Sequence, residues 1–390
     1  MTATIPKGFR AAGAAAGIRS GKGPDIALVV NDGPDNVAAV QLTTNRFCAA
    51  PVKLTRLHAE NSRAKAVILN AGCANACTGK KGSDDALTMA CETAAALGCR
   101  PKDILVCSTG MIGTYLPMEK VRAGITACVE SLSADEAAAD AASQAILTTD
   151  THPKTVLWTS PDKQWSIGAM IKGAGMLAPG MATMLCVMTT DAAVEPSEFA
   201  AALAEAVDVT LNRVDSDGCM STNDSVIALA SGASGVSPSK EQLAKALTDV
   251  LADLSMQLIC DAEGVNHTIA ITVKDAATQE GAVAAARAIS RSNLVKCAIF
   301  GNDPNWGRIL SELGTVSADV LPFEADNVSV TINDVCIFAH GGVARPRDEV
   351  DMSSQHVRID VSAGSGDASA TVLSNDLSHD YVHENSAYSS

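Results

Sequence analysis

The chain has 390 residues, enough for two or three domains at roughly 100–200 residues each, and 47% of the residues are hydrophobic. Its 29 basic and 44 acidic side chains give a net charge of −15, which argues against binding nucleic acid, because that needs a basic surface. No run of about 18 uncharged apolar residues occurs, which excludes a membrane-spanning helix, and the hydrophobic content argues against intrinsic disorder.

The first half of the chain alternates short strands with alanine-rich helices. Runs rich in Val and Ile, bounded by Gly, Pro, Asn or Asp, predict strands at 25–30, 37–43, 66–69 and 104–107. Apolar residues at three- and four-residue steps predict helices at 84–97, 117–131 and 134–147. Residues 155–158 and 165–171 are expected to form a hairpin.

The second half repeats this mixture and ends in strands. The same patterns predict helices at 196–211, 240–259 and 281–290. They predict strands at 184–190, 226–230, 268–273, 294–300, 328–332, 335–339, 357–361 and 368–373. Because strand pairs follow one another without helices between them, a strict βαβ order fails, and the predicted class is α+β.

The cysteines indicate a reducing compartment. Four of the twelve lie inside apolar runs, where a free thiol behaves as a small hydrophobe: Cys107, Cys186, Cys297 and Cys336. The N-terminus lacks the apolar core of a secretory signal, so we expect a cytoplasmic protein. Cys73 and Cys77 have no second Cys/His cluster to complete a zinc site, and we expect no metal.

The least ordinary segment is 172–185, where a Gly- and Pro-containing loop leads through Thr183 into an apolar run. From the pattern alone, an ordinary loop that enters a core strand is the favoured interpretation. The alternative is chain cleavage between Ala182 and Thr183, with the small Ala182 and the flexible Gly180 permitting the turn. Cleavage would leave an α-amine beside the Thr183 hydroxyl, and such an amine, with a pKa of ~7.7–8.0, can serve as its general base.

Eight further blocks occur in order along the chain. The first four are Gly8-Phe9-Arg10-Ala11-Ala12-Gly13, Asn75-Ala76-Cys77-Thr78-Gly79, Ser108-Thr109-Gly110-Met111-Ile112-Gly113 and Thr148-Thr149-Asp150-Thr151. The others are Asn212-Arg213-Val214, Asp217-Gly218-Cys219-Met220-Ser221-Thr222-Asn223-Asp224, Gly301-Asn302-Asp303-Pro304-Asn305-Trp306-Gly307-Arg308 and residues 385–390. With segment 172–185, they make the chain resemble the ornithine acetyltransferase family, the glutamate N-acetyltransferases of arginine biosynthesis.

The resemblance implies a role for each matching position. Thr183 would be the nucleophile, first in self-cleavage after Ala182 and then in accepting acetyl as an ester, with Thr109 and Gly110 as the oxyanion hole. The positions that would contact the amino-acid substrate are Thr148, Lys172, Thr183, Glu263, Asn385 and Ser390. Thr149 and Thr151 lie within a small alignment shift of Thr148. Without the family, Glu263 would be interpreted as a solvated helix end.

The implied reaction moves acetyl from N-acetylornithine to glutamate through acetyl-Thr183, in ping-pong order, with no cofactor. Acetyl-CoA is a further candidate donor, because single- and dual-donor members share these motifs. The implied fold is a layered αββα sandwich similar to that of N-terminal-nucleophile hydrolases. Residues 1–182 would form an α chain and residues 183–390 a β chain, assembled as an α2β2 heterotetramer.

Two departures from the family affect the substrate pocket. Val265-Asn266-His267 stands where the family usually has a small and then a basic residue, and Ser390 stands where threonine is more common.

Two alternatives to the acetyltransferase function remain open. One is an N-terminal-nucleophile amidohydrolase or aminopeptidase, in which water takes the acyl group. The other is an uncleaved amino-acid-binding protein without turnover.

Several other groups are expected to be structural. Asp215, Asp217 and Asp224 are spaced like metal ligands, but the Ser and Thr residues between them favour a hydrogen-bonded loop. Asp303-Pro304-Asn305-Trp306 predicts a rigid turn anchored by the tryptophan. His379 and His383 have helical spacing, but a zinc pair there is a minor alternative.

Overall fold

The computed structural model describes residues 4–21, 23–178 and 184–387. The predicted cleavage site at Ala182 and Thr183, and the C-terminal Ser390, lie outside the described residues. Within the described ranges, no helix is both long and apolar enough to cross a membrane.

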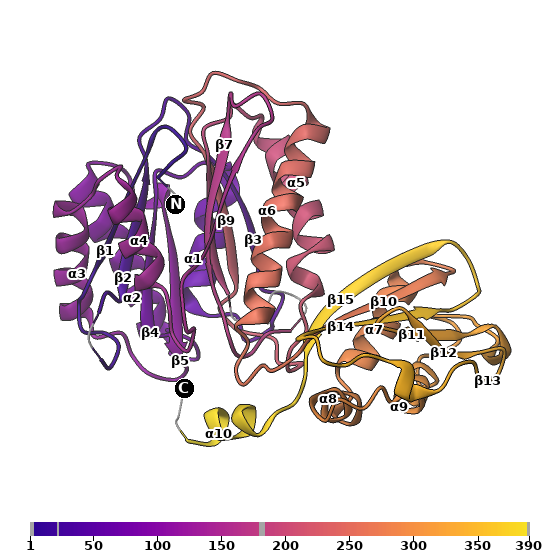
Figure 1. The fold of residues 1–390 in the computed structure, drawn as a ribbon. Coiled ribbons are helices and arrows are strands. Elements are labelled where there is room, and N and C mark those ends of the chain that lie inside the picture. Colours follow the sequence, from indigo (N-terminus) through magenta and orange to yellow (C-terminus); the bar gives the residue numbers. More distant parts are fainter. Residues whose placement is uncertain (1–3, 22, 179–183, 388–390) are drawn as a thin grey trace.

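Two stacked sheets form the larger part of the molecule (Figure 1). The first has four strands, in the order β1 (Phe9–Ala14), β2 (Ile26–Asn31), β4 (Ala66–Cys73) and β5 (Ile104–Met111). The second has five, in the order β3 (Val37–Leu42), β9 (Ser225–Ala230), β8 (Leu185–Thr190), β7 (Ser166–Lys172) and β6 (Lys154–Thr159). The β4–β5 and β8–β9 pairs are parallel, and the other pairs are antiparallel.

Helices cover the outer face of each sheet. α2 (Gly79–Leu97) and α3 (Met118–Glu130) pack on the first sheet, and α5 (Pro196–Val209) and α6 (Lys240–Cys260) pack on the second. α1 (Ala50–His58) packs on β5 and α2. α4 (Glu136–Ala145) packs on β1 and β2, and its buried Ala142 and Ala145 belong to the core between the two sheets. The order helices, sheet, sheet, helices is the expected αββα sandwich.

Most strands of the two sheets are buried on both faces, which explains the continuous apolar runs in the sequence. On β2, Ile26 and Leu28 face the outer helices, whereas Ala27 and Val29 face the second sheet. This alternation follows from the two-residue period of a strand, and it makes the space between the sheets a second core. The β6–β7 pair is the predicted hairpin.

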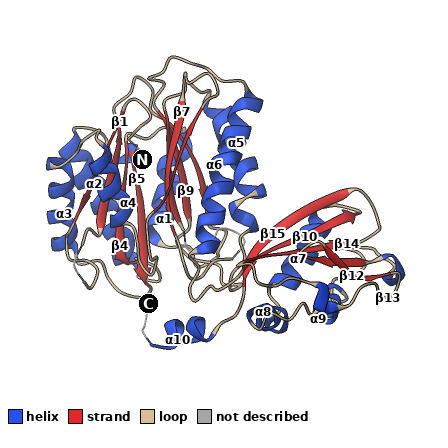
Figure 2. Ribbon diagram, in the orientation of Figure 1, coloured by secondary structure: helices blue, strands red, loops and turns tan. Residues whose placement is uncertain are grey.

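A smaller unit of strands and helices follows (Figure 2). Its buried apolar residues form a core of their own. Its six-stranded sheet has the order β13 (Gly342–Val343), β12 (Val335–Ala339), β11 (Ser329–Ile332), β14 (His356–Ser362), β10 (Thr268–Ala276) and β15 (Ala368–Asn375). Its helices are α7 (Gln279–Ser290), α8 (Asn293–Phe300) and α9 (Trp306–Leu313). The last helix, α10 (His379–Ala387), leads back to the larger unit.

The predicted strand at 294–300 is wrong, because these residues form helix α8. Ser292 caps the helix by accepting a hydrogen bond from the Val295 N–H, and Val295 and Ile299 bury one face. Short apolar runs do not distinguish a strand from a buried helix turn. In consequence Cys297 lies on the exposed face of α8 and does not act as a buried hydrophobe.

Two of the other three cysteines that were expected to be buried are buried. All twelve lie within the described residues, and all are free thiols. Cys107 on β5 and Cys186 on β8 are buried in the apolar core, whereas Cys336 is half-buried. Burial raises the pKa of Cys107 to about 12, so this thiol stays neutral and behaves as a core residue.

Candidate active site

A pocket at one end of the two sheets gathers most of the residues that the sequence singles out. It is lined by Ala74, Thr109, Gly110, Ile112, Thr148, Thr149, Lys172, Gly175, Met176, Ser221, Thr222, Asn223, Glu263 and Asn385. Six of the expected site residues are therefore together, although they come from strands, loops and the last helix. The remaining three, Ala182, Thr183 and Ser390, lie outside the described residues.

Strand alternation explains how the pocket forms between the sheets. On β5, Leu105 and Cys107 face the second sheet, and Thr109 continues that face. On β7, Met170 faces the first sheet, and Lys172 continues that face. The inward faces of β5 and β7 are thus apolar along the strands and become polar where the strands end.

Thr109 and Gly110 form the pocket wall at the end of β5. Gly110 has φ +122°, and a Cβ there would lie 2.4 Å from the backbone carbon of Gly72 on the paired strand, so only glycine fits. Thr109 is 1% exposed, and within the described part of the chain its Oγ1 has no hydrogen-bond partner. Buried hydroxyls normally have a hydrogen-bond partner. Because this one has none among the described residues, it can donate to a group bound in the pocket.

Lys172 supplies a buried cation opposite this wall. It is 1% exposed, and its Nζ donates a hydrogen bond of 2.6 Å to Thr148 Oγ1. The nearest oxygen of Asp150 is 3.8 Å from Nζ, which is an ion pair but no hydrogen bond. Burial lowers the pKa of Lys172, and Asp150 opposes that effect. This ammonium has capacity to bind an anionic group.

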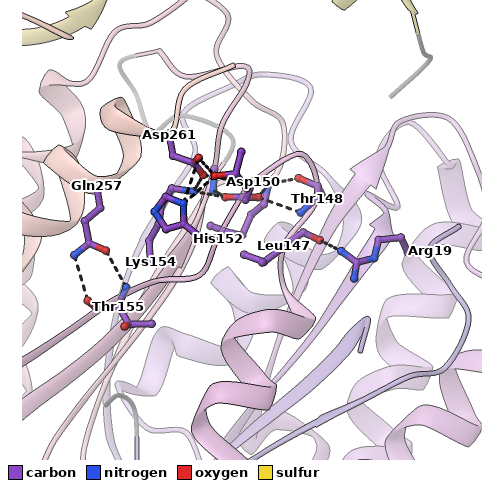
Figure 3. Close-up of polar contacts among 12 residues, drawn as sticks. Arg19, Leu147, Thr148, Asp150, His152, Lys154, Thr155, Gln257 and Asp261 are labelled. Carbon is purple, nitrogen blue, oxygen red and sulfur yellow. Dashed lines mark hydrogen bonds and ion pairs between the residues drawn. The ribbon is translucent and has the colours of Figure 1, made fainter. Parts of the chain in front are cut away.

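Asp150 holds the segments that carry Thr148 and Lys172. Its contact with Thr148 is drawn in Figure 3. Its Oδ1 accepts hydrogen bonds from Gly173 N–H at 2.6 Å and from Lys154 Nζ at 2.7 Å. Its Oδ2 accepts from Thr148 N–H at 3.0 Å. Burial alone would raise the pKa of Asp150, but Lys172 and Lys154 outweigh it and hold that pKa well below its ordinary value.

Glu263 lies just beyond the end of α6 and is 8% exposed, so it is a helix end but not a solvated one. Its N–H donates to Ala174 O at 3.0 Å, and its Oε2 accepts from Asn385 Nδ2 at 2.9 Å. A Cβ on Gly175 would lie 2.4 Å from Oε2, so the glycine leaves room for the carboxylate. The pocket therefore carries a cation at Lys172 and an anion at Glu263.

Asn385 reaches the pocket because α10 is fastened beside Glu263. Ser378 Oγ donates to Gly264 O at 2.5 Å. Gly264 has φ +65°, and a Cβ there would lie 2.2 Å from Tyr381 N, so the helix backbone fits closely against this glycine. The C-terminal helix thus crosses back from the smaller unit and completes the pocket.

Two polar residues in the 217–224 block were not singled out from the sequence as site residues. Asn223 lines the pocket, and its Nδ2 donates to Ala74 O at 2.6 Å and to Ser108 O at 2.8 Å, which fixes the backbone next to Thr109. Asp224 Oδ1 accepts at 3.0 Å from Met184 N–H, the residue after Thr183 in the chain. Burial raises the pKa of Asp224 well above its ordinary value. Their position in a polar block before strand β9 was the available signal.

The loop that carries Asp215 and Asp217 is hydrogen-bonded, as expected. Asp217 accepts from Met176 N–H at 2.7 Å and from Cys219 N–H at 3.0 Å, and Asp215 forms an ion pair with Arg291 at 2.8 Å. Across the described ranges, no group of three or more His, Cys, Asp or Glu residues is arranged to hold a metal.

The remaining groups have structural partners. Trp306 begins α9 after the predicted turn and stacks on Phe338 at 5.1 Å between ring centroids. His379 packs edge-on against Phe300. Thr151 donates its hydroxyl to Asp261 and not to the pocket, so Thr148 and Thr149 are the two threonines of that block that line it.

Comparison with known proteins assigns the chain to a family. The family model described as ArgJ family matches residues 10–390. The arginine biosynthesis bifunctional protein ArgJ of Bifidobacterium longum is 51% identical over 100% of both chains, and that of Streptomyces coelicolor is 50% identical, also over 100% of both. A crystal structure of ornithine acetyltransferase complexed with ornithine, from Mycobacterium tuberculosis, is 45% identical, covers 47% of this chain and 96% of its own, and has a TM-score of 0.45. The chain belongs to the ArgJ family.

Proposed function

We propose that this protein transfers acetyl from N-acetylornithine to glutamate and thereby releases ornithine and N-acetylglutamate in arginine biosynthesis. The observation that carries the proposal is the match to ArgJ relatives over the whole chain, at about half identity. The pocket supports it, because six positions expected from the family line one cavity.

The charges of the pocket fit amino-acid substrates. N-acetylornithine and glutamate both carry an α-carboxylate, and Lys172 is the buried cation that would bind it, with Thr148 beside it. The side-chain ammonium of ornithine would meet Glu263, whose carboxylate is oriented by Asn385. The terminal carboxylate of Ser390 is a second proposed partner for that ammonium.

The proposed chemistry is acyl transfer in two halves. The α-amine of Thr183 takes the proton from its own hydroxyl, and the oxygen attacks the acetyl carbonyl of N-acetylornithine. The C–N bond then breaks, the proton passes to the leaving amine, and ornithine departs. The α-amine of glutamate attacks the resulting ester, and the Thr183 oxygen leaves and recovers a proton.

Each half passes through a tetrahedral oxyanion, for which Thr109 and Gly110 are the proposed donors. The absence of a partner for Thr109 Oγ1 among the described residues supports this role, because donation would break no existing hydrogen bond. One such donor contributes on the order of 3–4 kcal/mol to the transition state. The Ser108 carbonyl is already held by Asn223, so the strand end is preorganised.

We further propose self-cleavage between Ala182 and Thr183, into chains 1–182 and 183–390. Strands β8 and β9 follow this point, yet they pair with β7 and β3, which precede it. The two chains would therefore remain in one sheet after cleavage. An α2β2 assembly in the cytoplasm is proposed from the family resemblance, and the word bifunctional in the relatives' names supports testing acetyl-CoA as a second donor.

An acetyl-transfer assay with and without glutamate tests the function. A transferase consumes N-acetylornithine continuously only when glutamate is present. Continuous release of acetate without glutamate would instead indicate the hydrolase alternative. An uncleaved single chain on a denaturing gel, with no turnover of either kind, would indicate the binding protein.

A further inference from the structure

Four charged side chains of alternating sign are buried in series from the pocket inward. Figure 3 shows three of them, Asp150, Lys154 and Asp261. The series runs from Lys172 through Asp150 and Lys154 to Asp261, and its side chains are 1%, 0%, 0% and 4% exposed. Lys154 Nζ lies 2.7 Å from Asp150 Oδ1 and 2.5 Å from Asp261 Oδ2. No step of the proposed chemistry uses Lys154 or Asp261.

This series connects the segments that carry the two charged groups of the pocket. Asp150 binds the backbone of Thr148 and of Gly173, which follows Lys172. Asp261 accepts from the Thr151 N–H at 3.1 Å and lies two residues before Glu263. Lys154 is the group that joins the two carboxylates.

We propose that Lys154 is a positioning residue that sets the separation between Lys172 and Glu263, and thereby the length of amino-acid substrate that the pocket accepts. The inference rests on the proposed function, because it takes Lys172 and Glu263 as the groups that bind opposite ends of the substrate. Lys154 itself is 0% exposed and does not line the pocket.

Electrostatics gives the reason for a buried lysine here. Without Lys154, the carboxylates of Asp150 and Asp261 would face each other with like charge in a buried site. Asp150 would then draw Lys172 Nζ from 3.8 Å toward hydrogen-bond distance and away from the substrate. Asp261 would lose its link to Asp150 through Lys154 and would keep its contacts with Thr151 and, at 3.5 Å, with His152 Nδ1. The turn that leads from Asp261 to Glu263 would then shift.

The test is Lys154→Met, which keeps an unbranched apolar side chain, one atom shorter than that of lysine, but removes its charge. Initial rates are measured with glutamate and either N-acetylornithine or the homologue that is one methylene longer, N2-acetyllysine. We expect KM for N-acetylornithine to rise by about tenfold or more with kcat changed far less, and the preference for N-acetylornithine over its homologue to fall by about tenfold.

Lys245→Met is the matched control, because Lys245 forms an exposed ion pair with Asp249 at the same four-residue spacing and at 2.8 Å. It should leave KM, kcat and the preference unchanged. If Lys154→Met does not fold, Asp261→Asn decides, since it preserves side-chain shape and the Lys154–Asp150 pair while weakening the other link. Asp261→Asn is expected to raise KM and reduce the preference in the same direction.

A folded Lys154→Met or Asp261→Asn protein with wild-type KM and wild-type preference would overturn the inference. If the wild-type protein transfers no acetyl at all, the proposed function fails separately. In that case calorimetric affinity for ornithine and for lysine, measured on the same variants, still decides whether Lys154 sets the length preference.

Discussion

Thr109→Ala is the substitution that separates a catalytic hydroxyl from a structural one. The Thr109 side chain is 1% exposed, and its Oγ1 has no hydrogen-bond partner among the described residues. Its removal should therefore cost no hydrogen bond in the folded state. The lost methyl corresponds to about 0.8 kcal/mol of burial, and loss of an unpaired hydroxyl offsets part of that cost. We expect the Tm to change little.

Turnover should respond very differently. If the hydroxyl donates to the acetyl oxygen as it becomes anionic, Thr109→Ala removes on the order of 3–4 kcal/mol from the transition state, or about a hundredfold or more in rate. Because the interaction forms only in the transition state, kcat and kcat/KM should fall together with little change in KM. Thr109→Ser retains the donor and should retain most of the activity.

The assay is steady-state acetyl transfer from N-acetylornithine to glutamate, on protein already separated into two chains. Using processed protein keeps any effect of Thr109 on self-cleavage out of the comparison. A stable, processed Thr109→Ala enzyme with near-normal kcat would refute the role of this hydroxyl. A large drop in Tm would instead show that Thr109 stabilises the fold although its hydroxyl makes no hydrogen bond among the described residues.

Three further predictions concern single residues. Gly110→Ala should abolish activity and lower the Tm, because the new Cβ would lie 2.4 Å from the backbone of Gly72 at φ +122°; a normal Tm and rate would contradict the geometry. The lowered pKa of Asp150 means that the folded state binds a proton less tightly than the unfolded state, so the carboxylate stabilises the fold above a pH of about 4 and loses this effect as the pH falls. Asp150→Asn should therefore make the free energy of unfolding less dependent on pH in acid. The same acid dependence in the variant and the wild type would contradict this role of Asp150. Thr183→Ala should remain one 390-residue chain on a denaturing gel, since no hydroxyl attacks the Ala182 carbonyl, and a processed variant would disprove self-cleavage.

Much of the layered fold was predictable because most of its strands are buried on both faces. The runs at 25–30 and 104–107 correspond to β2 and β5, since Val and Ile flanked by Gly, Pro or Asp leave little alternative. β1 has the composition of a helix, with three alanines in six residues, and is a strand because β2 pairs with it. The helix at 293–300 was missed because a short apolar run serves either structure.

The site was predictable only where the family resemblance named residues. Neither the burial of Glu263 nor its contact with Asn385, 122 positions away in the chain, is visible in local sequence. Lys154 and Asp261 are 107 positions apart, and each alone is an ordinary charged residue near the end of an element. Only the tertiary fold makes them a buried pair, since no local pattern encodes a contact across that separation.

In the proposed reaction, acetyl passes through a covalent ester on Thr183. The most direct measurement is mass spectrometry of the processed protein mixed with N-acetylornithine alone, without glutamate. We expect one added acetyl group on the chain that begins at Thr183, and its loss when glutamate is added. An unmodified chain, together with intersecting lines in two-substrate initial-rate plots, would contradict the acetyl-Thr183 intermediate and indicate direct transfer between two bound substrates.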